Sequence, residues 1–140
     1  MQLRLCTLTR LYEPLGLDPE VLAGAVSAWR HWINKELPHA LDWNESPTAP
    51  FEDAEVGEAD WEALCAGAGD QLTRPELWLP GDHDFLFLVR DLAEREIWAG
   101  SSAELQRELE SRPEGTPGRQ ILLRLARRSL EFGLPLARLP

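Results

Sequence analysis

Cysteine, lysine and long apolar runs are scarce in this sequence. The two cysteines, Cys6 and Cys65, are 59 residues apart and form no CxxC motif, so neither a disulfide framework nor a thiol redox motif is expected. They are best interpreted as small buried hydrophobic residues of a cytoplasmic protein. No apolar run is long enough to cross a membrane, and Arg4 and Arg10 interrupt the N-terminal one, so no secretory signal is expected.

Nucleotide-binding and hydrolase motifs are also missing. The glycines at 115 and 118 are not followed by the lysine and hydroxyl of a phosphate-binding loop. Ser101 and Ser102 follow Gly100 but lack the second glycine of a GxSxG elbow, and Glu104 instead suits a helix-capping box with Ser101. We therefore predict no catalytic site, no metal and no cofactor.

One triplet keeps an enzymatic alternative open. Asp82, His83 and Asp84 are adjacent, and a hydrolase could use His83 with either carboxyl group. Adjacent side chains on an extended or turning backbone point apart, whereas a metal site needs convergent ligands. A polar turn between strands is the favoured interpretation.

What the sequence does contain is enough apolar material for a core. It has 140 residues, of which 44% are hydrophobic, and six tryptophans. This length is near the commonest domain size, so we expect one domain over 1–140. Its fold class is predicted as α+β, mainly helical with a small antiparallel sheet.

The net charge of −10 comes from one stretch of the chain. Ten acids and no lysine or arginine lie from Glu36 to Thr73, whereas the remaining 14 acids balance all 14 lysine and arginine residues. Residues 38–57 are rich in proline and are expected to form an acidic loop. The predicted partner-binding residues lie in and just after it: Asp42, Trp43, Glu45, Glu52, Asp53, Glu55, Glu58, Asp60 and Glu62.

This acidic stretch has two interpretations. It could be a solvated surface that keeps the protein soluble, in part neutralised by the arginines of the last helix. It could instead dock a protein partner with a basic surface. Trp43 and Trp61 would then be anchors, although the favoured interpretation is that both pin the segment to the domain. Nucleic-acid binding is disfavoured because the excess charge has the wrong sign.

Helices are predicted in five places. Residues 3–12 are assigned to a helix with alternation as the competitor. Asp18 caps the next helix, which ends before Pro38 and carries an apolar stripe. Shorter helices are expected over 58–66 and from Ser101 or Ser102. Thr116 and Pro117 are expected to begin the last. The residues expected on the two long buried stripes are Val21, Leu22, Ala25, Val26, Trp29, Trp32, Ile33, Ile121, Leu122, Leu125, Ala126 and Leu130.

The sheet is expected from residues 77–99. LWLP at 77–80 and FLFLV at 85–89 are typical of short strands, and EIWA at 96–99 is the hairpin partner. A helix over 85–92 competes, because Phe85, Leu88, Val89 and Leu92 also share a helical face. After the last helix, residues 134–140 are expected to run out extended.

The C-terminal half resembles a known group of small proteins. WLPGDHDFLF at 78–87, IWAGSSAELQRELE at 97–110 and LARRSLEFGLPL at 125–136 are similar to segments of bacterial immunity proteins, which neutralise secreted toxins. The resemblance implies a non-enzymatic, protein-binding role and assigns no functional residue.

The leading hypothesis is therefore a cytoplasmic protein-binding module, an immunity-like inhibitor of a basic protein, with no membrane association. The alternatives are a small hydrolase around Asp82, His83 and Asp84, or a structural subunit of a larger assembly. A homodimer through the amphipathic helices is compatible with each.

Overall fold

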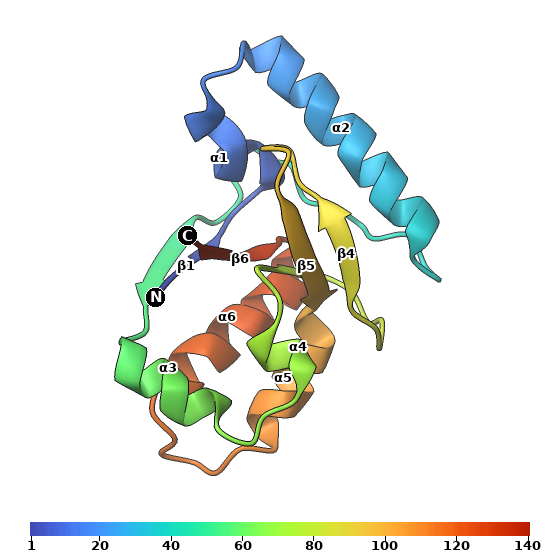
Figure 1. The fold of residues 1–140 in the computed structure, drawn as a ribbon. Coiled ribbons are helices and arrows are strands. Elements are labelled where there is room, and N and C mark those ends of the chain that lie inside the picture. Colours follow the sequence, from blue (N-terminus) through green and yellow to red (C-terminus); the bar gives the residue numbers. More distant parts are fainter.

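The computed structural model describes all 140 residues and has one six-stranded sheet between helices (Figure 1). Along the chain the elements are β1 (Gln2–Leu5), α1 (Leu8–Tyr12), a 3₁₀ turn (Glu13–Leu15), α2 (Pro19–Glu36), β2 (Glu52–Glu55), α3 (Glu58–Cys65), α4 (Asp70–Thr73), β3 (Leu77–Leu79), β4 (Phe87–Arg90), β5 (Glu96–Ser101), α5 (Ser102–Glu110), α6 (Arg119–Phe132) and β6 (Leu136–Leu139). No helix is long and apolar enough to span a bilayer.

The sheet order is β2-β1-β6-β3-β5-β4. Every neighbouring pair is antiparallel except β3 and β5, which run parallel. The α+β class is confirmed, but the prediction of a small antiparallel sheet needs correction, because the sheet is larger and mixed. The physical reason is β6, which inserts between β1 and β3 and joins two smaller groups of strands into one sheet.

One face of the sheet is covered by α5 and α6. Leu3 and Leu5 of β1 and Trp78 of β3 point to this side and pack with Leu105 of α5 and Leu122 of α6, all fully buried. Since strand side chains alternate between faces, the intervening residues of the same strands face the other side. This layer forms the larger part of the core.

The other face is covered by α2, and only over part of the sheet. Leu22, Val26, Trp29 and Ile33 of α2 pack on residues of β3, β4, β5 and β6. Asp18 caps this helix by accepting a hydrogen bond from the Glu20 amide at 3.0 Å, as predicted. The predicted stripe was too wide, because Val21 is 58% exposed and Trp32 is 45% exposed.

Three element predictions need correction. Residues 2–5 form β1, which pairs with β2 on one side and with β6 on the other and turns Leu3 and Leu5 to the same face of the sheet, and the helix begins only at Leu8. The segment 38–57 contains the strand β2. The C-terminal residues expected to run out extended form β6, which lies inside the sheet.

The 85–99 region is a hairpin, as predicted, with β4 beginning at Phe87, and the competing helix is wrong. In α6 the first helical residue is Arg119, after Gly118 in a left-handed conformation, so Thr116 and Pro117 lie outside the helix. The buried face of α6 includes Leu123, whereas Ile121 is exposed.

Candidate functional site

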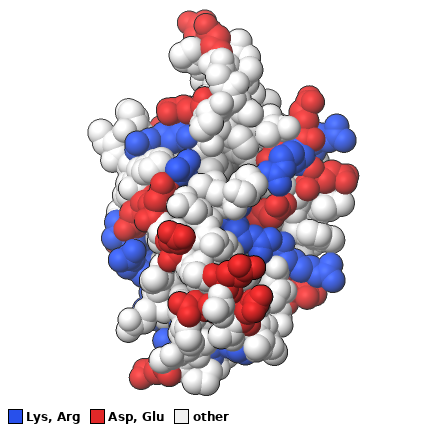
Figure 2. Space-filling model, turned by 60° about the vertical axis from the view of Figure 1, so that its left-hand side comes forward, with Lys and Arg blue, Asp and Glu red and all other residues white.

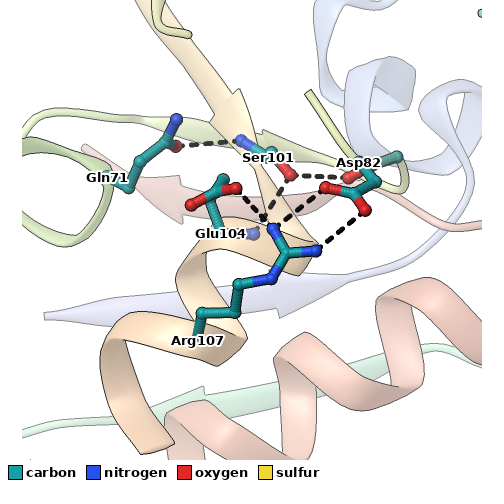
Figure 3. Close-up of polar contacts among 6 residues, drawn as sticks. Gln71, Asp82, Ser101, Glu104 and Arg107 are labelled. Carbon is teal, nitrogen blue, oxygen red and sulfur yellow. Dashed lines mark hydrogen bonds and ion pairs between the residues drawn. The ribbon is translucent and has the colours of Figure 1, made fainter. Parts of the chain in front are cut away.

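The carboxyl ends of the parallel strands β3 and β5 bring together two motifs that are far apart in sequence (Figure 3). Gly81, Asp82 and His83 follow β3, and Ser101 ends β5 and begins α5. The Ser101 hydroxyl donates to the Gly81 carbonyl at 2.6 Å. No feature of the sequence predicts this proximity, because it depends on the parallel pairing of β3 with β5, which begins about 20 residues later.

Both hydrogen-bonding roles of the Ser101 hydroxyl are used within the chain. Besides donating to Gly81, it accepts from the Glu104 amide at 3.2 Å, which is the predicted helix cap. The Ser101 amide donates to Gln71 Oε1 at 3.1 Å. Ser102 Oγ lies 2.6 Å from Ser129 Oγ in the core. Both serines are fully buried, and neither hydroxyl is bonded to a histidine.

Arg107 of α5 joins the two motifs on the surface. Its guanidinium donates to both Asp82 oxygens, at 3.0 and 2.8 Å, and also pairs with Glu104 (Figure 3). The hydrogen bonds to Arg107 hold the pKa of Asp82 below its usual range, and the same bonds raise the pKa of Arg107. The pair lies on the solvent-exposed surface. Because Asp82 belongs to the loop after β3 and Arg107 to α5, the pair tethers this loop to the helix.

His83 is the most unusual group near this tether. It is 4% exposed, packs against Phe85 and Phe87, and neither ring nitrogen has a partner with hydrogen-bond geometry. Burial lowers the pKa of His83, although the nearby Gly100 backbone and Asp82 act in the opposite direction. His83 is therefore neutral near pH 7, and its ring packs against the two phenylalanine rings as an apolar side chain does.

The predicted alternative site, Asp82, His83 and Asp84, does not converge. Asp82 turns out to Arg107, His83 turns into the aromatic cluster, and Asp84 lines a shallow depression of about 520 Å³ with Glu104, Arg107 and Glu108. No three His, Cys, Asp or Glu side chains in the chain are placed to hold a metal ion.

Three of the predicted partner-binding carboxylates have partners within the chain, although Asp53 stays exposed. Glu45 accepts hydrogen bonds from the Leu8 and Thr9 amides at the start of α1. Asp53 forms a two-point ion pair with Arg4, at 2.7 and 2.9 Å, which lowers the pKa of Asp53. Glu52 lies 2.6 Å from Arg128 of α6, the arginine neutralisation that the sequence suggested.

Trp43 and Asp42 lie apart from the other predicted residues. The Trp43 indole donates to Asn34 Oδ1 at 3.0 Å and makes an edge contact with Trp29, so it pins its loop to α2. Asp42 is exposed and lies against Gly133 at the C-terminal end of α6. The β2–α3 connection packs on Gly118 at the other end of α6. Because α6 has 14 residues, its two ends are about 20 Å apart.

Besides Asp42, four predicted acids remain exposed and form no ion pair. They are Glu55 at the end of β2 and Glu58, Asp60 and Glu62 of α3, and we call them the acidic β2–α3 surface. Figure 2, which brings this side of the molecule forward, shows acidic side chains gathered in its lower half, with arginines around them. Trp61, also in α3, is half-buried under Arg138 and serves the core.

The backbone beside this surface is a free sheet edge. Met1 and Val56 exchange both backbone hydrogen bonds, at 2.8 and 2.9 Å. Bonded and non-bonded pairs alternate in an antiparallel ladder, so the N–H and C=O groups of Asp53 and Glu55 point away from β1. At the opposite edge, the outward Arg90 carbonyl of β4 accepts from the Trp29 indole at 3.0 Å.

The chain has no recognisable relatives in the comparisons: no protein-family model, no curated protein and no solved structure matches it.

Proposed function

We propose that this chain is a non-enzymatic protein-binding module that receives a basic surface of a protein partner on its acidic β2–α3 surface. The observation that carries the proposal is the position of Glu55, Glu58, Asp60 and Glu62, exposed and unpaired on two consecutive elements. Carboxylates that are not neutralised internally leave a negative potential that attracts and orients a basic partner.

The predicted acids divide into those that have a partner within the chain and those that have none, and this division supports the role. Glu45, Glu52 and Asp53 have structural partners, so they stabilise the fold and are removed from the docking surface. The exposed four have no structural task in common. Like charges held close together on a folded surface oppose folding, and a binding role gives a reason for them.

An inhibitor of immunity type, acting in a bacterial cytoplasm on a basic toxin, is the form of this proposal that the sequence resemblance favours. Such an inhibitor needs a preformed surface and no catalytic group. The Ser101 hydroxyl caps a helix and the His83 ring is packed among phenylalanines, so the enzymatic alternative gains no support from these residues.

The test is a comparison of two variants with the same net charge. In the first, Glu55→Gln, Glu58→Gln, Asp60→Asn and Glu62→Gln neutralise the acidic β2–α3 surface. In the second, Glu13, Glu96, Glu110 and Glu114, which are also exposed, become glutamine. Each protein is immobilised and exposed to lysate of the native host, and retained proteins are identified by mass spectrometry.

The proposal expects a basic protein that the wild type and the second variant retain and the first variant loses. Its affinity should fall at least about tenfold between 50 and 300 mM salt, because screening weakens exposed charge pairs. Equal retention by both variants, or an affinity independent of salt, would show that the acidic surface is not the docking site.

A further inference from the structure

A band of apolar side chains runs along one flank of α2, about 100° around the helix from the stripe that packs on the sheet. Figure 1 shows that α2 lies at the periphery of the fold. Val21 and Trp32 are 58% and 45% exposed, Ala28 is exposed, and Ala25 is half-buried. Leu17, 44% exposed, extends the band just before the helix. A helix packed on a sheet ordinarily presents polar residues to solvent outside its buried stripe, so this exposed apolar flank resembles a second contact face.

We propose that two copies of this chain associate through this exposed flank of α2, with the two helices antiparallel. Val21, Ala25, Ala28 and Trp32 are separated by four, three and four residues. This is the spacing of a helix–helix seam, in which apolar residues recur every 3.5 residues on average and stay in line along the helix. We call these four residues the α2 seam.

The α2 seam is complementary to itself when the second helix runs in the opposite direction. A two-fold axis midway between Ala25 and Ala28 places Trp32 of one copy opposite Val21 of the other, and Ala25 opposite Ala28. Large side chains then meet at both ends, while alanines at the centre allow the helix axes to approach to about 8 Å. A two-fold dimer requires a patch that matches itself in this way.

Charge along one flank of the α2 seam selects the same orientation. Glu20 lies at the N-terminal end of α2, and His31 and Lys35 follow 11 and 15 residues later, near whole numbers of turns, so all three share one side. In an antiparallel pair Glu20 of one copy approaches Lys35 of the other. In a parallel two-fold pair the charged sides of the two copies would lie on opposite flanks of the contact, so this pairing of Glu20 with Lys35 would not form. The antiparallel helix dipoles favour the same arrangement.

The contact is small, so the dimer is weak. An 18-residue helix is about 27 Å long, so a contact strip about 10 Å wide along it covers an area well below the roughly 800 Å² per partner of a standard interface. The α2 seam lies over the β3–β5–β4 end of the sheet, whereas the acidic β2–α3 surface lies at the other end. The dimer therefore does not depend on the proposed function.

Sedimentation equilibrium of the full chain from about 10 μM to about 1 mM tests the proposal. The weight-average mass should rise from 15.8 kDa toward twice that value with concentration. Val21→Glu and Trp32→Glu should each weaken the dissociation constant at least about tenfold, because they bury a carboxylate in the contact. Val21 is mostly exposed in the monomer, so its variant keeps the fold, which far-ultraviolet circular dichroism verifies.

Two further variants make the test specific. Leu88→Glu changes an apolar residue of similar exposure, 49%, on β4 and should leave association unchanged. Lys35→Glu should weaken association, and combining it with Glu20→Lys should restore it, which only the antiparallel pairing predicts. The proposal is overturned by a mass of 15.8 kDa at all concentrations, by association that survives Val21→Glu, by an equal effect of Leu88→Glu, or by failure of the double charge exchange to restore binding.

Discussion

At the scale of single residues, Gly100 shows how closely the core of the candidate site is packed. A Cβ atom there would lie 2.7 Å from both Gln71 Oε1 and the Pro75 ring, and a ring cannot swing aside as a chain end can. We expect Gly100→Ala to lower the free energy of unfolding by about 1–3 kcal/mol, as overpacking does. Urea denaturation measures this change.

Gly24 supplies the opposite case and serves as the control. It lies within α2 with no atom within 4 Å of an added Cβ. Gly24→Ala should raise the free energy of unfolding by about 0.5–1 kcal/mol, because alanine loses less backbone freedom on entering a helix. A destabilised Gly24→Ala together with a neutral Gly100→Ala would contradict the packing described here.

His83 predicts how stability depends on pH. Because burial keeps the pKa of His83 below its ordinary value of 6.5, the folded state binds a proton less readily than the unfolded chain. The free energy of unfolding should be at its full value above about pH 6.5, and this contribution is lost as the pH falls from there toward the folded pKa.

Replacing His83 with phenylalanine should remove that part of the pH dependence. Denaturation curves between pH 7 and pH 5 should therefore show a smaller loss of stability for His83→Phe than for the wild type. His31→Gln, at an exposed position of α2, is the control and should leave the slope unchanged. Identical slopes for wild type and His83→Phe would mean that His83 is not held neutral by burial.

At the scale of elements, the start of α5 depends on one hydroxyl. Ser101→Ala removes the cap of α5 and leaves the Gly81 carbonyl without its donor. We expect a loss of about 1–3 kcal/mol in the free energy of unfolding. Ser101→Thr, which keeps the hydroxyl, should recover most of it if the added methyl group is accommodated near Gly81. Thermal denaturation distinguishes the two, and an unaffected Ser101→Ala would exclude the capping role.

Elements with strong local signals were predictable from sequence. Asp18 and Pro19 mark the start of α2, and the Ser101–Glu104 spacing marks the start of α5, because capping involves only neighbouring residues. β1 and β6 were not predictable in the same way. Four residues containing two leucines are compatible with helix or strand, and only pairing between the two ends of the chain decides between them.

The candidate site was predictable only in its components. The sequence identified the acids, Ser101 and the Asp82–His83–Asp84 triplet, but it could not distinguish acids with an arginine partner from those without one. Asp53 and Glu55 are two residues apart on β2, yet one pairs with Arg4 and the other has no partner. That difference depends on the register of β2 against β1, which places Arg4 opposite Asp53 and Gln2 opposite Glu55.

At the scale of the whole molecule, the net charge of −10 opposes folding through self-repulsion. Added sodium chloride screens this repulsion, so the free energy of unfolding should rise between about 20 and 300 mM salt. Neutralising the four acids of the β2–α3 surface changes the charge from −10 to −10 + 4 = −6 and should reduce this rise. The measurement is urea denaturation at several salt concentrations.

The matched variant at Glu13, Glu96, Glu110 and Glu114 also has a charge of −6, but its acids are dispersed along the chain. It should reduce the salt effect less, because repulsion between neighbouring charges is stronger than between distant ones. Equal effects of the two variants would show that total charge, and not its concentration at one end of the sheet, governs stability.

The two margins of the sheet differ in a way that limits how it can be extended. The indole of Trp29 occupies the outward carbonyl of Arg90 on β4, while Asp53 and Glu55 leave β2 available. An added strand would therefore meet a competing donor at Arg90 on β4 and none at Asp53 or Glu55 on β2. Three of the four residues of β2 are acids, so two molecules joined β2 to β2 would bring like charges side by side, and this repulsion opposes growth of the sheet into a fibril.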